Sequence, residues 1–570
     1  MKSGMFLGLV ILLAVMVSAC GPTVEPADMV LHNGKIATVD PVKPEAHAIA
    51  IRGDVIAAVG SEEEIKPYIG PSTKVIDLAG MLAIPGFIES HGHFTSLGAT
   101  KLELDLTRAA NWDEIVAIVA DAAKKAKPGE YILGRGWHQE KWNKVPSPNV
   151  ERFPVHAELS KVSPNNPVLL THASGHATFA NAKAMELAGV TRRTPNPPGG
   201  DILHDAQGNL AGVFRETAGN LVDKGLEGTR SKRTPREVEA DARRIVDLAA
   251  QDCLSKGITT FYDAGQSFET VDLYKRLADE GKLDLRLWVM LSEGNQSLAH
   301  NISKYRMIGY GDKHLTVRSI KRLIDGALGS RTAWLLEPYA DLATSTGLNT
   351  YKVEDLKETA RLAIENGFQL CTHAIGDRAN REALNVYEAA FKAHPDSKDL
   401  RWRIEHAQHI AAADIPRFGA LGVIAAMQAI HCTSDAPYVL ARLGAKRAEE
   451  GAYVWQKLMK SGAIVSNGTD VPVEDANPIA CYYASVTRKL KDGTTFYPDQ
   501  RMSREEALKS YTLNAAYSGF EENIKGSLVP GKLADITVLS QDILTIPEDE
   551  IAKTEVRFTI VGGKVLFPRK

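Results

Sequence analysis

This chain of 570 residues has few cysteines and no large excess of positive or negative charge. Its five cysteines are too few for a disulfide scaffold. The 67 Lys and Arg residues nearly balance the 70 Asp and Glu residues, so the formal net charge is −3 and we expect no nucleic-acid partner. The chain is also too apolar for intrinsic disorder, because 44% of its residues are hydrophobic and 24% are charged.

An apolar run near the N-terminus, from Met5 to Val17, is too short to span a bilayer comfortably and has the layout of a secretory signal. The stretch Val-Ser-Ala-Cys-Gly at 17–21 resembles a bacterial lipoprotein signal, in which Cys20 is lipidated. The resemblance implies that residues 1–20 are a signal segment and that the protein is exported and anchored to a membrane by lipid. Because Gly21 follows the cysteine, the resemblance favours a location at the outer membrane or in the periplasm of a Gram-negative bacterium. A plain signal peptide cleaved nearby is the alternative.

Both ends of the remaining chain are rich in short strands. Residues 28–84 alternate apolar and polar positions between glycine turns, and the last residues have the same pattern at 535–539 and 558–561. Each end is too short for a core of its own. We therefore expect residues 21–84 and 521–570 to pack together as one small β-sandwich.

In the middle of the chain, helical stretches alternate with short apolar runs. Residues 236–256, for example, have helical spacing and stop at Gly257 before the run at 258–262. Eight such runs lie at 84–91, 258–262, 285–291, 320–324, 368–373, 402–406, 423–427 and 463–467. The alternation predicts parallel βα units, and eight units predict an α/β fold of the (β/α)₈ TIM-barrel type over residues 85–520. A doubly wound open sheet has the same periodicity and stays open as an alternative.

One segment interrupts this rhythm. Residues from about 98 to 234 separate the first run from the second, and they are far longer than an ordinary βα loop. An insertion of this size at the active-site face of a barrel predicts a lid or a pocket wall.

Imidazole and carboxylate groups stand at the ends of four of these runs. His91 and His93 are two residues apart on an extended chain, so both imidazoles point to one side and one cation can bind both. His373, His406 and Asp470 follow later runs, where barrel strands deliver their C-terminal ends. A lone histidine there is more often hydrogen-bonded than bound to metal. Four strands that present such groups together predict zinc or a similar divalent ion.

Longer motifs accompany these residues. They are Pro-Gly-Phe-Ile-Glu-Ser-His-Gly-His at 85–93, Gly-Arg-Gly-Trp-His-Gln at 134–139, Gly-His-Ala-Thr-Phe-Ala-Asn at 175–181, Lys-Arg-Leu-Ile-Asp-Gly-Ala-Leu-Gly-Ser-Arg-Thr-Ala at 321–333, Thr-His-Ala-Ile-Gly-Asp-Arg-Ala at 372–379, Arg-Ile-Glu-His-Ala-Gln at 403–408, Asn-Gly-Thr-Asp-Val-Pro at 467–472 and Gly-Ser-Leu-Val-Pro-Gly-Lys-Leu-Ala-Asp at 526–535. With them the chain resembles the amidohydrolase superfamily, and more narrowly the branch of N-substituted formamide deformylases and exoenzyme-regulator-like proteins. The resemblance covers nearly all of the mature chain.

The resemblance implies a role for each matching position. His91 and His93 would hold one metal ion together with Asp470, and His373 and His406 would hold a second. Lys321 matches a lysine that bridges the two ions. A free lysine is a cation with no lone pair to give to a metal, so this role requires that carbon dioxide first converts the amine of Lys321 to an anionic carbamate. An ordinary lysine in a salt bridge is the alternative.

The reaction that such a site suits best is hydrolysis of a carbon–nitrogen bond in a small-molecule, non-peptide amide. A divalent ion lowers the pKa of a water that it binds from about 15.7 to about 7, and Asp470 can take the proton and pass it to the leaving nitrogen. The large insertion favours linear N-acyl or N-formyl substrates. A cyclic-amide hydrolase or an aminohydrolase on the same scaffold is the alternative. A catalytically inactive, lipid-anchored binding protein is disfavoured, because all six candidate ligands are present.

Two positions depart from the family pattern. Glu89 stands where the family often has Asp, and His138 stands where Asp is expected, which bears on substrate choice. We expect four side chains to line the substrate pocket, namely Trp137, His138, His176 and Arg331. Packing, capping and structural roles are the alternatives for these residues. A homodimer is a further expectation.

Overall fold

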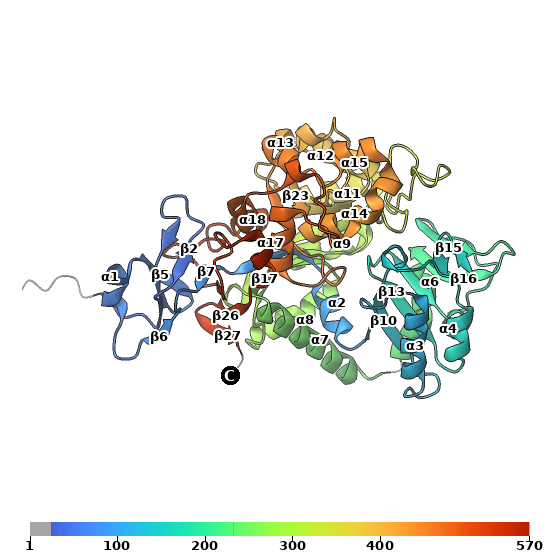
Figure 1. Ribbon diagram of the computed structural model, residues 1–570, viewed down its shortest axis with the longest axis horizontal. Helices are drawn as coiled ribbons and strands as arrows, with labels where there is room; N and C mark the ends of the chain where they lie inside the picture. Colours follow the sequence, from blue (N-terminus) through green and yellow to red (C-terminus); the bar gives the residue numbers. More distant parts are fainter. Residues whose placement is uncertain (1–23, 232, 569–570) are drawn as a thin grey trace, which may run out of the picture.

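The computed structural model describes residues 24–231 and 233–568. The predicted signal segment with Cys20 lies outside these residues. No helix in the described part of the chain is long and apolar enough to cross a membrane. Figure 1 shows the sheets of the two chain ends at one end of the molecule, the insertion at the other, and the barrel between them.

Eight parallel strands form the barrel of the central sheet, and their order in the sheet follows their order in the chain. A ninth, short strand, β19 (Met307–Gly309), pairs antiparallel with the fourth of them. The eight barrel strands are β8 (Phe87–Gly92), β17 (Ile258–Gln266), β18 (Arg286–Leu291), β20 (Leu315–Leu323), β21 (Gln369–Ala374), β22 (Arg403–His406), β23 (Ile424–Met427) and β24 (Val465–Asn467). The last strand returns to the first, because the Asp470 amide donates to the His91 carbonyl at 2.8 Å and the His93 amide donates to the Val471 carbonyl at 2.7 Å. This nearly closed parallel sheet confirms the predicted barrel, and the open doubly wound sheet is wrong.

Helices between the strands cover the barrel, and their sequences explain where they begin and end. The helix α7 (Pro235–Ser255) begins with proline at its first position and with a capping box between Thr234 and Glu237. The helix α11 (Val353–Asn366) ends at Gly367, which adopts the left-handed conformation that glycine tolerates. Two further helices of this layer are α8 (Phe268–Asp279) and α12 (Asp377–Ala393). Their apolar faces belong to one large buried cluster with the strands.

The two chain ends share one sheet. Its strands β3 (Glu45–Ala46), β2 (Lys35–Ala37) and β7 (Leu82–Pro85) come from the N-terminal end, and β25 (Ile536–Leu539), β26 (Val556–Val561) and β27 (Lys564–Phe567) come from the C-terminal end. A second sheet has the order β5 (Val55–Gly60), β4 (Ala48–Arg52), β1 (Met29–His32), β6 (Lys74–Asp77). Ile36, Ile51 and Val538 belong to one buried cluster, so both ends contribute to the same core. The β-sandwich as a unit stays a prediction.

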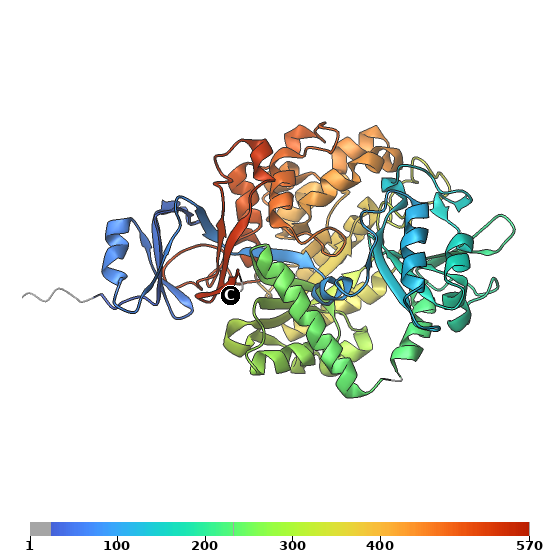
Figure 2. The ribbon, with the colours of Figure 1, turned by 60° about the horizontal axis from the view of Figure 1, so that its bottom comes forward.

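The insertion is a folded α/β layer of its own. Its sheet has the order β15 (Gly200–His204), β16 (Leu210–Glu216), β14 (Ala177–Ala180), β13 (Val168–His172), β10 (Ile132–Trp137), β9 (Leu104–Asp105). The helices α3 (Trp112–Ala123), α4 (Ala157–Val162), α5 (Ala182–Leu187) and α6 (Gly219–Arg230) accompany it (Figure 2). Trp112, Trp137 and Phe179 bury one another in a cluster separate from the barrel core. The insertion therefore has enough apolar surface to pack by itself.

Candidate metal centre and active site

The C-terminal ends of the barrel strands bring four of the predicted ligands together, namely His91, His93, His406 and Asp470. The Oδ1 atom of Asp470 lies 3.3 Å from Nε2 of His93 and 3.6 Å from Nε2 of His91. The Oδ2 atom lies 3.9 Å from Nδ1 of His406. Burial alone would raise the pKa of Asp470, but His93, His406 and His91 hold it well below its usual range. Asp470 is therefore an anion surrounded by imidazoles.

Glu405, on β22, fixes the ring of His91. Nδ1 of His91 donates to the carboxylate of Glu405, which Arg403 also binds at 2.7 Å. Burial would raise the pKa of Glu405, but Arg403 and His91 lower it to about 2. Burial lowers the pKa of His91 to about 4, so this imidazole is neutral near pH 7. With its Nδ1 proton directed at Glu405, His91 has a lone pair on Nε2, as a metal ligand requires.

The other two predicted histidines are held in similar ways. Nδ1 of His406 donates to the side-chain oxygen of Gln428 at 2.7 Å, which leaves the lone pair on Nε2. Nε2 of His373 lies 3.3 Å from Oδ1 of Asp325, so Nδ1 is the atom of His373 left for a metal. The two rings are 4.5 Å apart between centroids. Burial lowers the pKa of both imidazoles.

Lys321 is buried beside His91 on β20. Its Nζ atom lies 3.3 Å from Nε2 of His91, and the described residues place no carboxylate oxygen within 4.0 Å of it. A charged ammonium group buried without a counter-ion is costly. Burial accordingly lowers the pKa of Lys321 and favours the neutral amine.

His431 is a candidate ligand that the sequence reasoning missed. It lies in the first turn of α14 (Ala429–Leu443), four residues after the end of β23. One ligand atom each from His406, His431 and Asp470 lie within 4.8 Å of one another, and all three residues are buried. Nδ1 of His431 accepts a hydrogen bond from Gln408 at 2.9 Å, and Nε2, which has no hydrogen-bond partner among the described residues, lies 3.9 Å from Oδ2 of Asp470. Its place after the seventh strand was the signal that could have found it.

These donor atoms suit a divalent cation. The Oδ1 atom of Asp470 is buried and receives no well-aligned hydrogen bond from the described residues. A buried carboxylate oxygen without a donor is costly unless a cation satisfies it. Neutral imidazole nitrogens beside a carboxylate are the ligands that zinc and similar ions prefer.

Glu89 joins the first strand to the loop that carries Asp470. Its carboxylate accepts hydrogen bonds from the amide and the hydroxyl of Thr469, both at 2.7 Å, and from the His91 amide at 3.2 Å. Burial raises the pKa of Glu89 to about 8. Glu89 therefore holds the loop that carries Asp470, and its own carboxylate is directed at Thr469.

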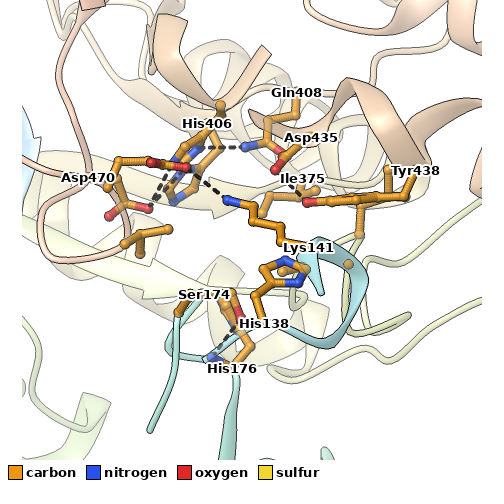
Figure 3. Close-up of a pocket in the computed structure, with 17 residues that line it drawn as sticks. His138, Lys141, Ser174, His176, Ile375, His406, Gln408, Asp435, Tyr438 and Asp470 are labelled. Atoms are coloured by element: carbon orange, nitrogen blue, oxygen red, sulfur yellow. Dashed lines mark hydrogen bonds and ion pairs between the residues drawn. The ribbon is translucent and has the colours of Figure 1, made fainter. Parts of the chain in front are cut away.

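The pocket above these residues has walls from both the barrel and the insertion. Figure 3 shows His138 and His176 on one side and His406 and Asp470 on the other, and all four line the cavity. Nδ1 of His176 pairs with Glu216 at 2.8 Å. Two predicted pocket residues lie elsewhere.

Trp137 and Arg331 do not line this cavity. The indole of Trp137 is buried in the core of the insertion, where Nε1 donates to the Leu170 carbonyl at 2.9 Å. Arg331 is buried and paired with Asp341 at 3.0 Å. The packing and structural alternatives describe these two side chains.

Comparison with known proteins agrees with this geometry. Residues 74–567 match the sequence profile of the amidohydrolase family, so the chain belongs to that family. Protein LONG AFTER FAR-RED 3 of Arabidopsis thaliana is 34% identical over 559 residues, which cover 95% of this chain and 92% of the relative. An N-substituted formamide deformylase of Arthrobacter pascens is 27% identical over 95% of this chain and 98% of its own. A metal-dependent hydrolase of Pyrococcus horikoshii OT3 has a TM-score of 0.72 at 26% identity and covers 91% of this chain and 99% of its own.

The chain is thus a metal-dependent amidohydrolase that acts on carbon–nitrogen bonds of small molecules. The predictions of an enzyme and of a divalent metal cofactor are confirmed at this level. The alternative of an inactive binding protein is wrong.

Proposed function

We propose that this enzyme hydrolyses linear N-formyl or N-acyl amides with one or two zinc ions. The observation that carries the proposal is the convergence of His91, His93, His406 and Asp470 at the strand ends, with two of the imidazoles oriented by Glu405 and Gln428. A bound ion would supply a Lewis acid and a more acidic water. His91, His93 and Asp470 would hold one ion, and His373 and His406 a second.

Asp470 is the general base and acid of the proposal. Because the surrounding imidazoles keep it ionised, it can accept a proton from the attacking water. Its position at the pocket wall lets it return that proton to the leaving nitrogen. The new carbon–oxygen bond forms as the carbon–nitrogen bond breaks, and the products are a carboxylate or formate and an amine.

Lys321 is proposed to be the bridging ligand after carboxylation. A neutral amine adds to carbon dioxide, forms a carbon–nitrogen bond and releases one proton. Burial lowers the pKa of Lys321 more than the nearby Glu405 and Asp470 raise it, which supports the neutral amine. The carbamate would supply two anionic oxygens to the metal ligands.

The substrate class rests on the likeness to the N-substituted formamide deformylase, supported by the walled pocket. The test is to assay N-formyl amines, N-acyl amines and cyclic imides side by side with zinc-loaded protein. We expect the N-formyl amines or the N-acyl amines to be cleaved at least tenfold faster than the cyclic imides. Faster cleavage of the imides would contradict the proposal.

The location of the enzyme belongs to the proposal as well. We infer export and lipid attachment through Cys20, with the two end sheets as a β-sandwich and a homodimer as the assembly. Replacing Cys20→Ser should release the protein from the membrane fraction to the soluble fraction. An unchanged distribution would contradict the lipid anchor.

A further inference from the structure

A second cleft opens beside the candidate metal centre, between the insertion and the barrel. Its volume is about 950 Å³. It shares five wall residues with the active-site pocket, namely His138, Lys141, Ala173, Val473 and Glu474. Because the same five residues line both cavities, the second cleft adjoins the active-site pocket.

The charges on this cleft are not all neutralised by the protein. Two of its five basic side chains are ion-paired, Lys141 with Glu474 at 3.3 Å and Lys101 with Asp252 at 2.6 Å. Arg135 differs from them, because the ion pairs of the described residues include none with its guanidinium within 4.0 Å. It is a half-buried cation on the wall next to the reaction site.

The guanidinium of Arg135 is held in place without being saturated. Nε donates to the Pro472 carbonyl at 3.4 Å, and Nη2 donates to the Ala173 carbonyl at 3.1 Å. Pro472 follows Asp470 by two residues, so Arg135 joins the insertion to the loop of the proposed base. Of the five N–H groups of a guanidinium, three make no hydrogen bond with the described residues. A carboxylate is the group whose two oxygens match such a planar donor edge.

The same cleft has an apolar side. Trp142, Leu97 and Leu104 line it. The ring of Trp142 packs against Trp112 at 6.1 Å and Trp137 at 6.2 Å between centroids, so it is a fixed surface. The cleft therefore offers an apolar side and a polar side.

On the polar side, Arg135, Arg108 and Lys491 form no ion pair among the described residues, whereas two of the three carboxylates, those of Glu474 and Asp475, are paired with lysines and the third belongs to Asp105. Of the three unpaired cations, Arg135 is the one that is half-buried and hydrogen-bonded to the loop after Asp470.

We propose that this cleft binds the distal end of the substrate, with Arg135 binding a carboxylate there. The substrates are then anionic N-formyl or N-acyl amines with an apolar group, of the N-formyl amino acid type. This inference rests on the proposed function for its reaction, but the anion site can be tested separately.

The kinetic test uses N-formylphenylalanine and N-formylphenylalaninamide, which differ only in the carboxylate. The zinc-loaded wild type is expected to prefer the acid by about tenfold or more in kcat/KM. Arg135→Gln should lower kcat/KM for the acid by about tenfold to a hundredfold, mainly through KM, and change the amide less than about twofold. Arg135→Lys should keep part of the preference. Arg361→Gln, on the exposed face of α11, is the control and should change neither value.

The binding test needs no turnover. Calorimetry on the zinc-loaded protein compares 3-phenylpropionate with the neutral 3-phenylpropan-1-ol. A preference for the acid that disappears in Arg135→Gln supports the anion site, even if neither formyl compound is cleaved, in which case only the proposed function fails. Equal affinity for acid and alcohol in the wild type, or equal losses for both in Arg135→Gln, would overturn the anion site.

Discussion

The barrel and the insertion build the two walls of one pocket in different ways. In the barrel, His91 lies near the end of β8, which pairs with β17 and hydrogen-bonds to the loop after β24, and His406 ends β22, which pairs with β21 and β23. A second buried group fixes each ring. In the insertion, His138 follows β10 and His176 precedes β14 of a separate sheet, and both line the pocket. The barrel therefore fixes the geometry of the candidate ligands, whereas the insertion shapes the space in front of them.

The largest effect should come from removing the metal from the barrel side. Dialysis against a chelator is expected to abolish hydrolysis, and zinc should restore it. The far-ultraviolet circular dichroism should stay unchanged, because the core is apolar and does not include the metal ligands. Full activity in protein shown by elemental analysis to hold no transition metal would contradict a catalytic role for the metal ligands of the barrel.

Asp470→Asn should reduce kcat by about 10³-fold, because the amide cannot accept the proton of the attacking water. Steady-state kinetics on a formamide substrate measures this effect. Asp492→Asn, in an exposed turn, is the matched control and should leave kcat unchanged. A decrease smaller than about tenfold would show that Asp470 is not the base.

Glu405→Gln should weaken metal binding by about tenfold to a hundredfold, because Glu405 orients His91 and raises its basicity. Competition with a chromophoric chelator gives the dissociation constant. Asp535→Asn is the control, since it breaks another buried ion pair with an arginine. Its partner, Arg286, lies at the N-terminal end of β18, away from the candidate ligands at the C-terminal strand ends. The control should lower the melting temperature without changing the metal affinity, and equal losses of affinity in both variants would contradict the orienting role.

The smallest effect should come from the insertion. His138→Asn is expected to change the ratio of kcat/KM between N-formyl and N-acetyl amines by about tenfold, since a pocket wall acts through fit to the substrate. The bound metal per chain should remain that of the wild type. His300→Asn, at an exposed helix position, serves as the control. Loss of metal in His138→Asn would show that the insertion also holds the ion.

Much of the barrel could be predicted because its signals are local. Each apolar run and each helix is a pattern of neighbouring residues, so all eight strands fell within or beside the predicted runs. The His91 and His93 pair follows from the alternation of side chains along one strand. The eight-fold count then placed His373, His406 and Asp470 on one face of the barrel.

The supporting contacts could not be predicted in this way. Glu405 is separated from His91 by 314 positions, and only the closed sheet brings them together. Trp137 was expected in the pocket, but the insertion has its own core and buries this indole there. Nothing in the local pattern distinguishes a tryptophan that faces a substrate from one that faces a core.

The sequence alone determined the order of strands and helices, the residue types at the strand ends and the family. The tertiary structure decided which nitrogen of His91, His373 and His406 is left for a metal, and that Lys321 is buried beside His91. It also decided that His431 lies beside His406 and Asp470 and that Arg135 lines a cleft. The physical reason is that secondary structure depends on residues a few positions apart. Burial, ion pairing and tautomer depend on groups that meet only when the chain has folded.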